Sequence, residues 1–131
     1  MNKVSARLRV DLTPACAIGP GKIALLEAIA ITGSLSAAAR RLKMSYLRAW
    51  RLLKSLNTSF RRPVVKLSKG GLGGGGAILT PFGTRLVEAY RALESDVLRR
   101  ARSTFATIVK SAVSGGAKGA KHRQLKRAAS R

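Results

Sequence analysis

The spacing of apolar positions predicts a strand followed by a core helix at the start of the chain. Residues 7–12 alternate charged and apolar side chains, as a half-buried strand does, and Thr13-Pro14 ends that run. The helix begins in Gly19-Pro20-Gly21, because a proline in the first turn removes no hydrogen bond, and it ends at Gly33. Its core-facing stripe consists of Ile23, Leu26, Ile29 and Ala30.

Two further helices are predicted on either side of a tight connection at Lys43-Met44. Ser36 is the expected N-cap of a short helix over Ala37–Leu42, which is almost wholly alanine and arginine. Ser45 is the expected N-cap of a third helix over Tyr46–Leu56. The apolar side of that helix, expected to face the core, carries Ala49, Trp50, Leu53 and Leu56 or Asn57. Three cations recur every third residue on a neighbouring face: Arg48, Arg51 and Lys54.

The second half of the chain predicts a β-hairpin and one long helix. Strands over Val64–Leu67 and Ala77–Leu79 are joined by a glycine-rich connection, as in a hairpin. Thr80-Pro81 then starts a helix whose apolar positions, from Phe82 to Ala112, are spaced by three and four. A continuous helix of that length would measure about 45 Å. Because its apolar positions form a continuous seam, we expect it to pack against a partner helix.

Charge narrows the class of partner. The chain has 26 Lys and Arg against five acids, a net charge of +21 that attracts DNA, RNA or an anionic membrane. Ten of these cations and no acid lie in residues 97–131, so residues 1–96 carry +11 of their own. The most apolar stretch, Ile23–Ile31, contains Glu27 and is far shorter than the ~20 residues of a membrane-spanning helix. We therefore expect a cytoplasmic protein of the nucleoid, with no membrane partner.

The sequence offers little for catalysis. Cys16 is the only cysteine, which excludes a disulfide framework and a cysteine-rich zinc site. His122 lies in the basic tail, and the five acids are scattered rather than paired with a nucleophile. The glycines at 71, 73 and 76 match a dinucleotide fingerprint, but a strand and not a helix follows them. We predict that the chain is not an enzyme and has no catalytic residues, cofactor or metal.

A short alanine-rich helix, a tight turn and a helix with one basic face are the parts of a helix-turn-helix. The predicted recognition helix over 45–57 would lie in the major groove, where arginines pair with guanine. The hairpin over 64–79 would be the wing, and its glycines allow a close approach to the DNA backbone or minor groove. The predicted DNA-binding residues are Ser34, Ser36, Ser45, Tyr46, Arg48, Arg51, Lys54, Arg61, Arg62, Lys66 and Lys69.

Several segments together resemble a known family. They are Arg7–Val10, Gly19–Ile29, Thr32–Ala39, Met44-Ser45-Tyr46 with Ala49-Trp50, and Gly70–Gly83. In this order they are similar to the DNA-binding domain of the molybdate-responsive ModE regulators, a winged helix related to that of LysR-type proteins, over about residues 5–95. The resemblance implies a dimer held partly by the long helix, with Ser45, Tyr46 and the Arg48/Arg51 face reading DNA. Full-length members carry C-terminal oxyanion-binding modules where this chain has a basic tail, so molybdate binding is not expected in this chain.

The expected fold is mainly α with a small β wing, a winged helix-turn-helix plus a long C-terminal dimerisation helix. The predicted domains are a winged helix-turn-helix over 1–80, a linker and dimerisation helix over 81–113, and a disordered basic tail over 114–131. The predicted function is that of a dimeric transcriptional regulator that binds specific sequences of double-stranded DNA. The alternatives are a non-specific nucleoid-associated protein and a protein-interaction module that works with a separate oxyanion-binding protein. RNA binding fits the charge, but the aromatic pattern of single-strand binders is missing.

Overall fold

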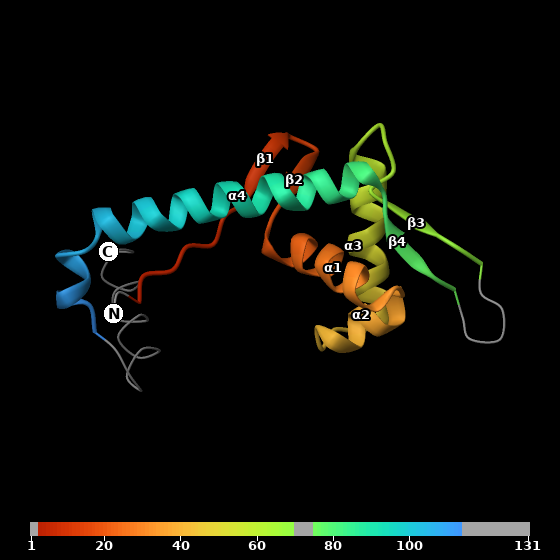
Figure 1. Ribbon diagram of the computed structural model, residues 1–131, viewed down its shortest axis with the longest axis horizontal. Coiled ribbons are helices and arrows are strands. Elements are labelled where there is room, and N and C mark those ends of the chain that lie inside the picture. Colours follow the sequence, from red (N-terminus) through yellow and green to blue (C-terminus); the bar gives the residue numbers. More distant parts are fainter. Residues whose placement is uncertain (1–2, 70–74, 114–131) are drawn as a thin grey trace, which may run out of the picture. The chain divides into compact units, whose positions relative to one another are not determined.

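The computed structural model describes residues 3–69 and 75–113 (Figure 1). The chain forms two compact units, a larger one over Ala6–Val97 and a smaller one that holds the remaining described residues. The larger unit is mainly helical and carries two small antiparallel strand pairs. It confirms the expected fold class, a winged helix-turn-helix followed by a long helix. The tail predicted over 114–131 lies outside the described residues, as does the tip of the predicted wing, residues 70–74.

The first β element is a pair of strands, whereas the sequence predicted a single strand. Strand β1 covers Val10–Thr13 rather than residues 7–12, and it pairs antiparallel with β2, Cys16–Ile18, in the register Val10↔Ile18. Strand β2 was not predicted, because three residues are too few to display an alternating pattern. Cys16 and Ile18 are buried, so β2 contributes to the core of the larger unit, whereas β1 is mostly exposed.

Helix α1, Pro20–Thr32, begins and ends where the sequence predicted. Pro20 occupies the first turn, and Gly33 adopts a left-handed φ of 75° while donating its N–H to the carbonyl of Ile29. Ala30 is exposed, so its assignment to the core stripe was wrong. The helix is apolar over most of its circumference, and spacing therefore could not identify its buried face. The buried side chains of α1 are Ile23, Leu25, Leu26, Ala28 and Ile29.

Helices α2, Leu35–Arg41, and α3, Tyr46–Ser59, form the helix-turn-helix pair. The N-cap of α2 is Ser34 and not Ser36, since the Ser34 hydroxyl accepts the N–H of Ala37 at 2.9 Å. Ser45 caps α3 as predicted, accepting the N–H of Arg48 at 3.1 Å.

The connection between α2 and α3 is closed by a left-handed residue that is not glycine. Lys43 has a φ of 55°, and its N–H donates to the carbonyl of Arg40. The N–H of Met44 donates to the carbonyl of Ala39, which completes the hydrogen-bond pair of a Schellman motif. The turn is therefore tight and uses its backbone donors.

Strands β3, Val65–Leu67, and β4, Ala77–Leu79, form the predicted hairpin, in the register Lys66↔Ile78. The start of β4 is joined to the helices by the N–H of Ala77, which donates to the carbonyl of Gly33 at 2.8 Å. At the outer end of the described strands, the N–H of Gly76 donates to the Ser68 hydroxyl at 3.0 Å. A Cβ on Gly76 would lie 2.8 Å from that hydroxyl oxygen, so a larger residue there would force the serine to move.

Helix α4, Pro81–Thr104, ends earlier than predicted. A helix over 81–113 was expected, but a turn follows Thr104 and a short 3-10 helix covers Ile108–Ser111. The apolar spacing continues through this region, yet β-branched residues are concentrated in it and lower its helix propensity. Those residues are Thr104, Thr107, Ile108 and Val109.

In the part of the chain that the structure describes, no single helix is long and apolar enough to cross a membrane.

Candidate nucleic-acid interface

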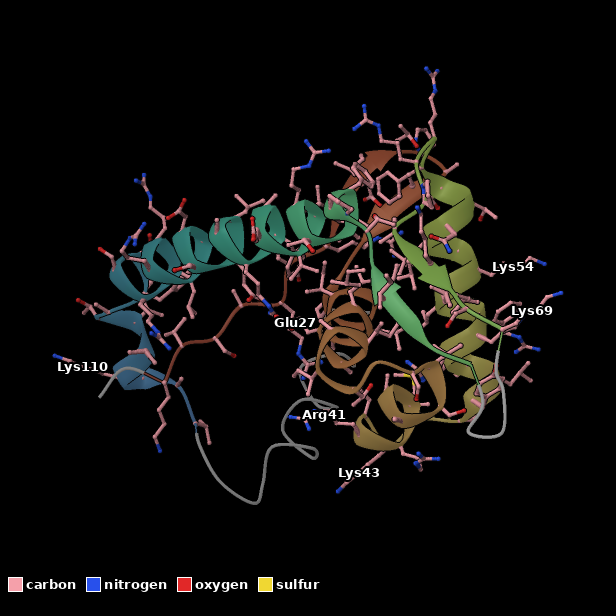
Figure 2. The ribbon with its side chains drawn as sticks, turned by 45° about the vertical axis from the view of Figure 1, so that its right-hand side comes forward. Glu27, Arg41, Lys43, Lys54, Lys69 and Lys110 are labelled. Carbon is pink, nitrogen blue, oxygen red and sulfur yellow. The ribbon has the colours of Figure 1, made fainter. Side chains whose placement is uncertain are left out.

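Helix α3 divides into a buried face and a cationic face. Ala49, Leu53 and Leu56 are fully buried in the core. On the other side, Arg48, Arg51 and Lys54 are all exposed, as the spacing of three predicted. Figure 2 shows Lys54 pointing away from α3, and no acidic residue lies on this helix. The exposed side of α3 therefore presents positive charge without internal neutralisation.

The hydroxyl residues of the site gather around the N-terminal ends of α2 and α3. Ser34 and Ser45 are N-caps whose oxygens already accept a backbone N–H, which leaves each hydroxyl hydrogen free to donate to another acceptor. Ser36 and Tyr46 line one open hollow of about 140 Å³ together with Ser68 and Gly76 at the outer end of the described wing strands. The structure thus brings both helix N-termini and the wing to the same hollow.

The cations of the wing and of the preceding loop occupy two different places. Lys66 and Lys69 are exposed on and just beyond β3, and Figure 2 shows Lys69 pointing outward from the end of this strand. Arg61 and Arg62 are also exposed, but they follow the C-terminal end of α3. Helix α3 has 14 residues, so these two arginines lie about 20 Å along the helix axis from Tyr46. They were predicted with the others and form a separate basic patch.

Two side chains on α3 are exposed although the sequence did not predict their exposure. Trp50 is 40% exposed, so its expected place in the core was wrong. Leu47 is 54% exposed and was not named at all, because its apolar character gave no signal for a binding residue. Together with Tyr46, 56% exposed, they place apolar surface among the cations at the first two turns of α3.

Asn57 fixes the wing against α3. Its side-chain oxygen accepts the backbone N–H groups of Val64 and Val65 at 2.8 and 3.1 Å, and its amide donates to the carbonyl of Val65 at 3.0 Å. Val64 and Val65 are buried, so these backbone groups have little access to water. The sequence placed Asn57 only as a possible member of the apolar side.

Thr80 performs a similar task at the start of α4. Its hydroxyl donates to the carbonyl of Pro63 at 2.7 Å and accepts the N–H of Gly83 at 3.0 Å, while its own N–H donates to the carbonyl of Val64 at 3.0 Å. A Cβ on Gly83 would lie 2.2 Å from that same carbonyl oxygen. The Thr-Pro-Phe-Gly segment of the resemblance therefore acts in packing, at the junction of wing and helix.

A charged link joins α1 to α4. Arg91 is hydrogen-bonded to both carboxylate oxygens of Glu27 and, through its other terminal nitrogen, to Glu94 at 2.6 Å. The hydrogen bonds to Glu27, and then the one to Glu94, raise the pKa of Arg91. Figure 2 shows Glu27 on the side of α1 that faces α4. Two of the five acids of the chain are thus neutralised locally, away from α3.

A hydrophobic hollow of about 130 Å³ lies between the first hairpin and α4. Its lining is almost entirely apolar, and the side chains of Leu12 and Leu93 are 53% and 43% exposed at its rim. The lining residues are Val10, Leu12, Ile18, Leu86, Ala89, Tyr90 and Leu93. Within residues 3–69 and 75–113, no group of three or more His, Cys, Asp and Glu side chains could hold a metal ion.

Comparison with known proteins finds similarity over the helix-turn-helix and the wing. Residues 21–84 match the model of the bacterial regulatory helix-turn-helix proteins of the lysR family. The molybdenum-pterin-binding protein MopB of Rhodobacter capsulatus is 46% identical over 82 residues, which cover 63% of this chain and 30% of MopB. The molybdenum transport protein ModE of Azotobacter vinelandii is 40% identical over 89 residues, covering 68% of this chain and 33% of that protein.

The DNA-binding transcriptional dual regulator ModE of Escherichia coli K12 is 40% identical over 74 residues, 56% of this chain and 28% of that protein. The chain thus spans about a third of the length of the curated relatives it matches. The resemblance to the ModE regulators found in the sequence is confirmed as homology over this part of the chain.

Proposed function

Because residues 21–84 match the model of the bacterial regulatory helix-turn-helix proteins of the lysR family, we propose that this chain is a sequence-specific transcriptional regulator that binds double-stranded DNA. The observation that carries the proposal is the exposed cationic face of α3, opposite a fully buried face of the same helix. A helix packed in this way holds its charged side rigidly toward the solvent. The major groove admits one α-helix, and arginine can donate two hydrogen bonds to guanine there.

In the proposed complex, α3 lies in the major groove with its N-terminal turns on the base edges. Tyr46, Arg48 and Arg51 then contact bases, while the hydroxyls of Ser34, Ser36 and Ser45 donate to phosphates. Lys54 continues the same face toward the backbone. Each of these residues is exposed or half-buried, which is what a direct contact requires.

The wing contacts the sugar-phosphate backbone or the minor groove beside the recognition helix. Lys66 and Lys69 supply charge from this side. Asn57 holds the base of the wing against α3, and the Gly33–Ala77 hydrogen bond holds the start of β4 against the helices. Arg61 and Arg62 follow the opposite end of α3, so we assign them to phosphates of a neighbouring part of the duplex. Such contacts add affinity that falls with salt and carries no sequence preference.

The protein acts as a dimer through α4 and the first hairpin. The apolar hollow between them exposes Leu12 and Leu93, and a second copy of the chain would remove this surface from water. A two-fold dimer predicts an inverted-repeat operator with half-sites about one helical turn apart. Light scattering on the purified chain tests this at micromolar concentration, where a monomer would contradict it.

The matched pair Leu93→Asp and Ser95→Asp locates the dimer interface. Both positions are exposed on α4, but they differ by two residues and so lie on nearly opposite sides of the helix. We expect Leu93→Asp to produce monomers and Ser95→Asp to leave the dimer intact. If both variants had the same oligomeric state, the dimer interface would not include the apolar hollow.

The function itself is tested by selecting bound fragments from a random duplex pool at physiological salt. An inverted-repeat motif bound about a thousandfold better than scrambled duplex is the expected result. Arg48→Ala should weaken binding to it by about 1–3 kcal/mol and relax the preference at one position. Arg100→Ala is the matched control, since it removes the same charge from an exposed position on α4 in the other unit. Uniform, salt-sensitive binding to every duplex would instead identify a non-specific nucleoid protein.

A further inference from the structure

Leu47 lies where a recognition helix meets base edges. It is the second residue of α3, in the turn that follows the Ser45 cap. Residues four and seven positions later share its side of the helix, and these are Arg51 and Lys54. The direction that Leu47 faces is therefore the direction of the exposed cations.

The fold makes no use of the Leu47 side chain. It is 54% exposed and lies outside the core cluster, whereas Leu52 and Leu53 of the same helix pack against or within that cluster. An exposed leucine at this position contributes little to stability, so a polar residue would fold as well. The side chain is therefore available for a contact in a complex.

The surroundings of Leu47 favour a polyanion that also carries an apolar group. Arg48, Arg51 and Lys54 are exposed around Leu47, and α3 holds no acid. A leucine cannot bind a phosphate or donate a hydrogen bond to a base. In the major groove, the only apolar group on a base edge is the C5-methyl of thymine.

From this juxtaposition we propose that Leu47 is a specificity-determining residue that reads one thymine in each half-site by packing against its C5-methyl group. The proposal rests on the proposed function, since it requires α3 in the major groove. Side chains four residues apart on a helix are about 6 Å apart, and base pairs are stacked every ~3.4 Å along the axis. The thymine therefore lies within about two base pairs of the base contacted by Arg51.

Deoxyuridine provides the test, because it pairs as thymidine does and lacks only the methyl group. Each thymine in one half-site of the selected duplex is replaced singly by deoxyuridine, and the dissociation constant is measured by fluorescence anisotropy. For the wild-type chain we expect one position to weaken binding about fourfold, the effect of exposing one methyl-sized apolar group. For Leu47→Ala, the same replacement should leave the affinity unchanged.

Two controls separate this contact from general effects. Ile31→Ala removes another exposed aliphatic side chain, from α1, and should retain the fourfold discrimination. Leu47→Met keeps an apolar side chain of similar volume and should retain most of it. Thermal melting of all three variants should match the wild type, because neither wild-type side chain is buried.

The outcomes are distinguishable. If no deoxyuridine position weakens wild-type binding, or if Leu47→Ala keeps the discrimination, the thymine assignment is overturned while the regulator function stands. If Leu47→Ala binds every duplex as the wild type does, Leu47 contacts something other than DNA. If no duplex is preferred over scrambled DNA at all, the proposed function fails first, and this inference fails with it.

Discussion

Asn57 offers the sharpest test of how the wing is held. In Asn57→Leu, a side chain without hydrogen-bonding groups takes the place of the amide and limits the entry of water. The N–H groups of Val64 and Val65 and the carbonyl of Val65 then lose their partner, although both valines remain buried. An unsatisfied buried donor costs about 1–3 kcal/mol. For two donors, with some relaxation of the strand, we expect a loss of about 3 kcal/mol in the free energy of unfolding.

Urea denaturation monitored by the fluorescence of the single tryptophan measures this loss. With a denaturant slope of about 1.5 kcal/mol per molar, the midpoint should fall by about 2 M. The matched control is Thr58→Val, since the Thr58 hydroxyl donates only to carbonyls of its own helix and is exposed. Its effect should stay within about 0.5 kcal/mol.

A conservative variant separates the two kinds of bond at Asn57. Asn57→Asp keeps an oxygen that can accept both backbone N–H groups but loses the donor to the carbonyl of Val65, so its stability should lie between the wild type and Asn57→Leu. The reasoning would be refuted if Asn57→Leu cost less than about 1 kcal/mol, or if the Thr58 variant cost as much.

Three further predictions concern stability. Gly83→Ala should destabilise the protein by about 1–3 kcal/mol in urea denaturation, because the added Cβ would meet the Val64 carbonyl oxygen. Gly21→Ala, with no atom within 4 Å of its Cβ, should instead stabilise the protein by up to about 1 kcal/mol. If both variants changed the stability in the same direction, the close approach at Gly83 would be contradicted. Lys43→Gly should raise stability by up to about 1 kcal/mol in the same assay, since a lysine at φ 55° is strained in a way that glycine is not; a clear loss would argue against the left-handed turn. Burial raises the pKa of Tyr90, as does Glu94, while Arg91 opposes the shift. The unfolded chain therefore loses this proton first, and the stabilisation present below about pH 10 is lost as the pH rises through the folded-state pKa. The melting temperature should fall less steeply towards high pH in Tyr90→Phe than in the wild type. Identical slopes would exclude Tyr90 as the cause.

The elements that sequence could predict are those with a long periodic pattern or a strong punctuating residue. Helix α1 is bounded by Pro20 and Gly33, and α3 has a buried face opposite a cationic one. The second strand of the wing lies between glycines and Thr80-Pro81. Each of these was predicted within a few residues, because local chemistry and the final packing agree there.

The failures have equally local causes. Strand β2 is too short for periodicity, and α4 ends at Thr104 although its apolar spacing continues, because propensity and not pattern decides there. The N-cap of α2 was assigned two residues too late because Ser34 and Ser36 are equally suitable by residue type. Trp50 was assigned to the core by its position next to Ala49, yet the neighbouring helices cover only the side of α3 that holds Ala49, Leu53 and Leu56.

The candidate site was predictable in its charges but not in its supports. Exposed cations can be recognised from composition and spacing, whereas Asn57 and Thr80 act through backbone groups that are distant in sequence. Their partners follow only once the wing is folded against α3 and α4. Leu47 was not named for a different reason, because an apolar side chain gives no signal of a binding role in the sequence.

The hydrogen bond from Ala77 to the Gly33 carbonyl also bears on the thermodynamics of association. It joins the start of β4 to the turn before α2 in the unbound chain, so this junction loses its conformational entropy on folding and not on binding. A protein of this kind meets its partner preorganised, and its heat-capacity change on binding should reflect the surface that the contact buries, without the larger contribution of coupled folding. Replacing that one backbone donor, for instance by a proline at position 77, should transfer part of the ordering cost from folding to binding, and calorimetry would record it as a more unfavourable binding entropy.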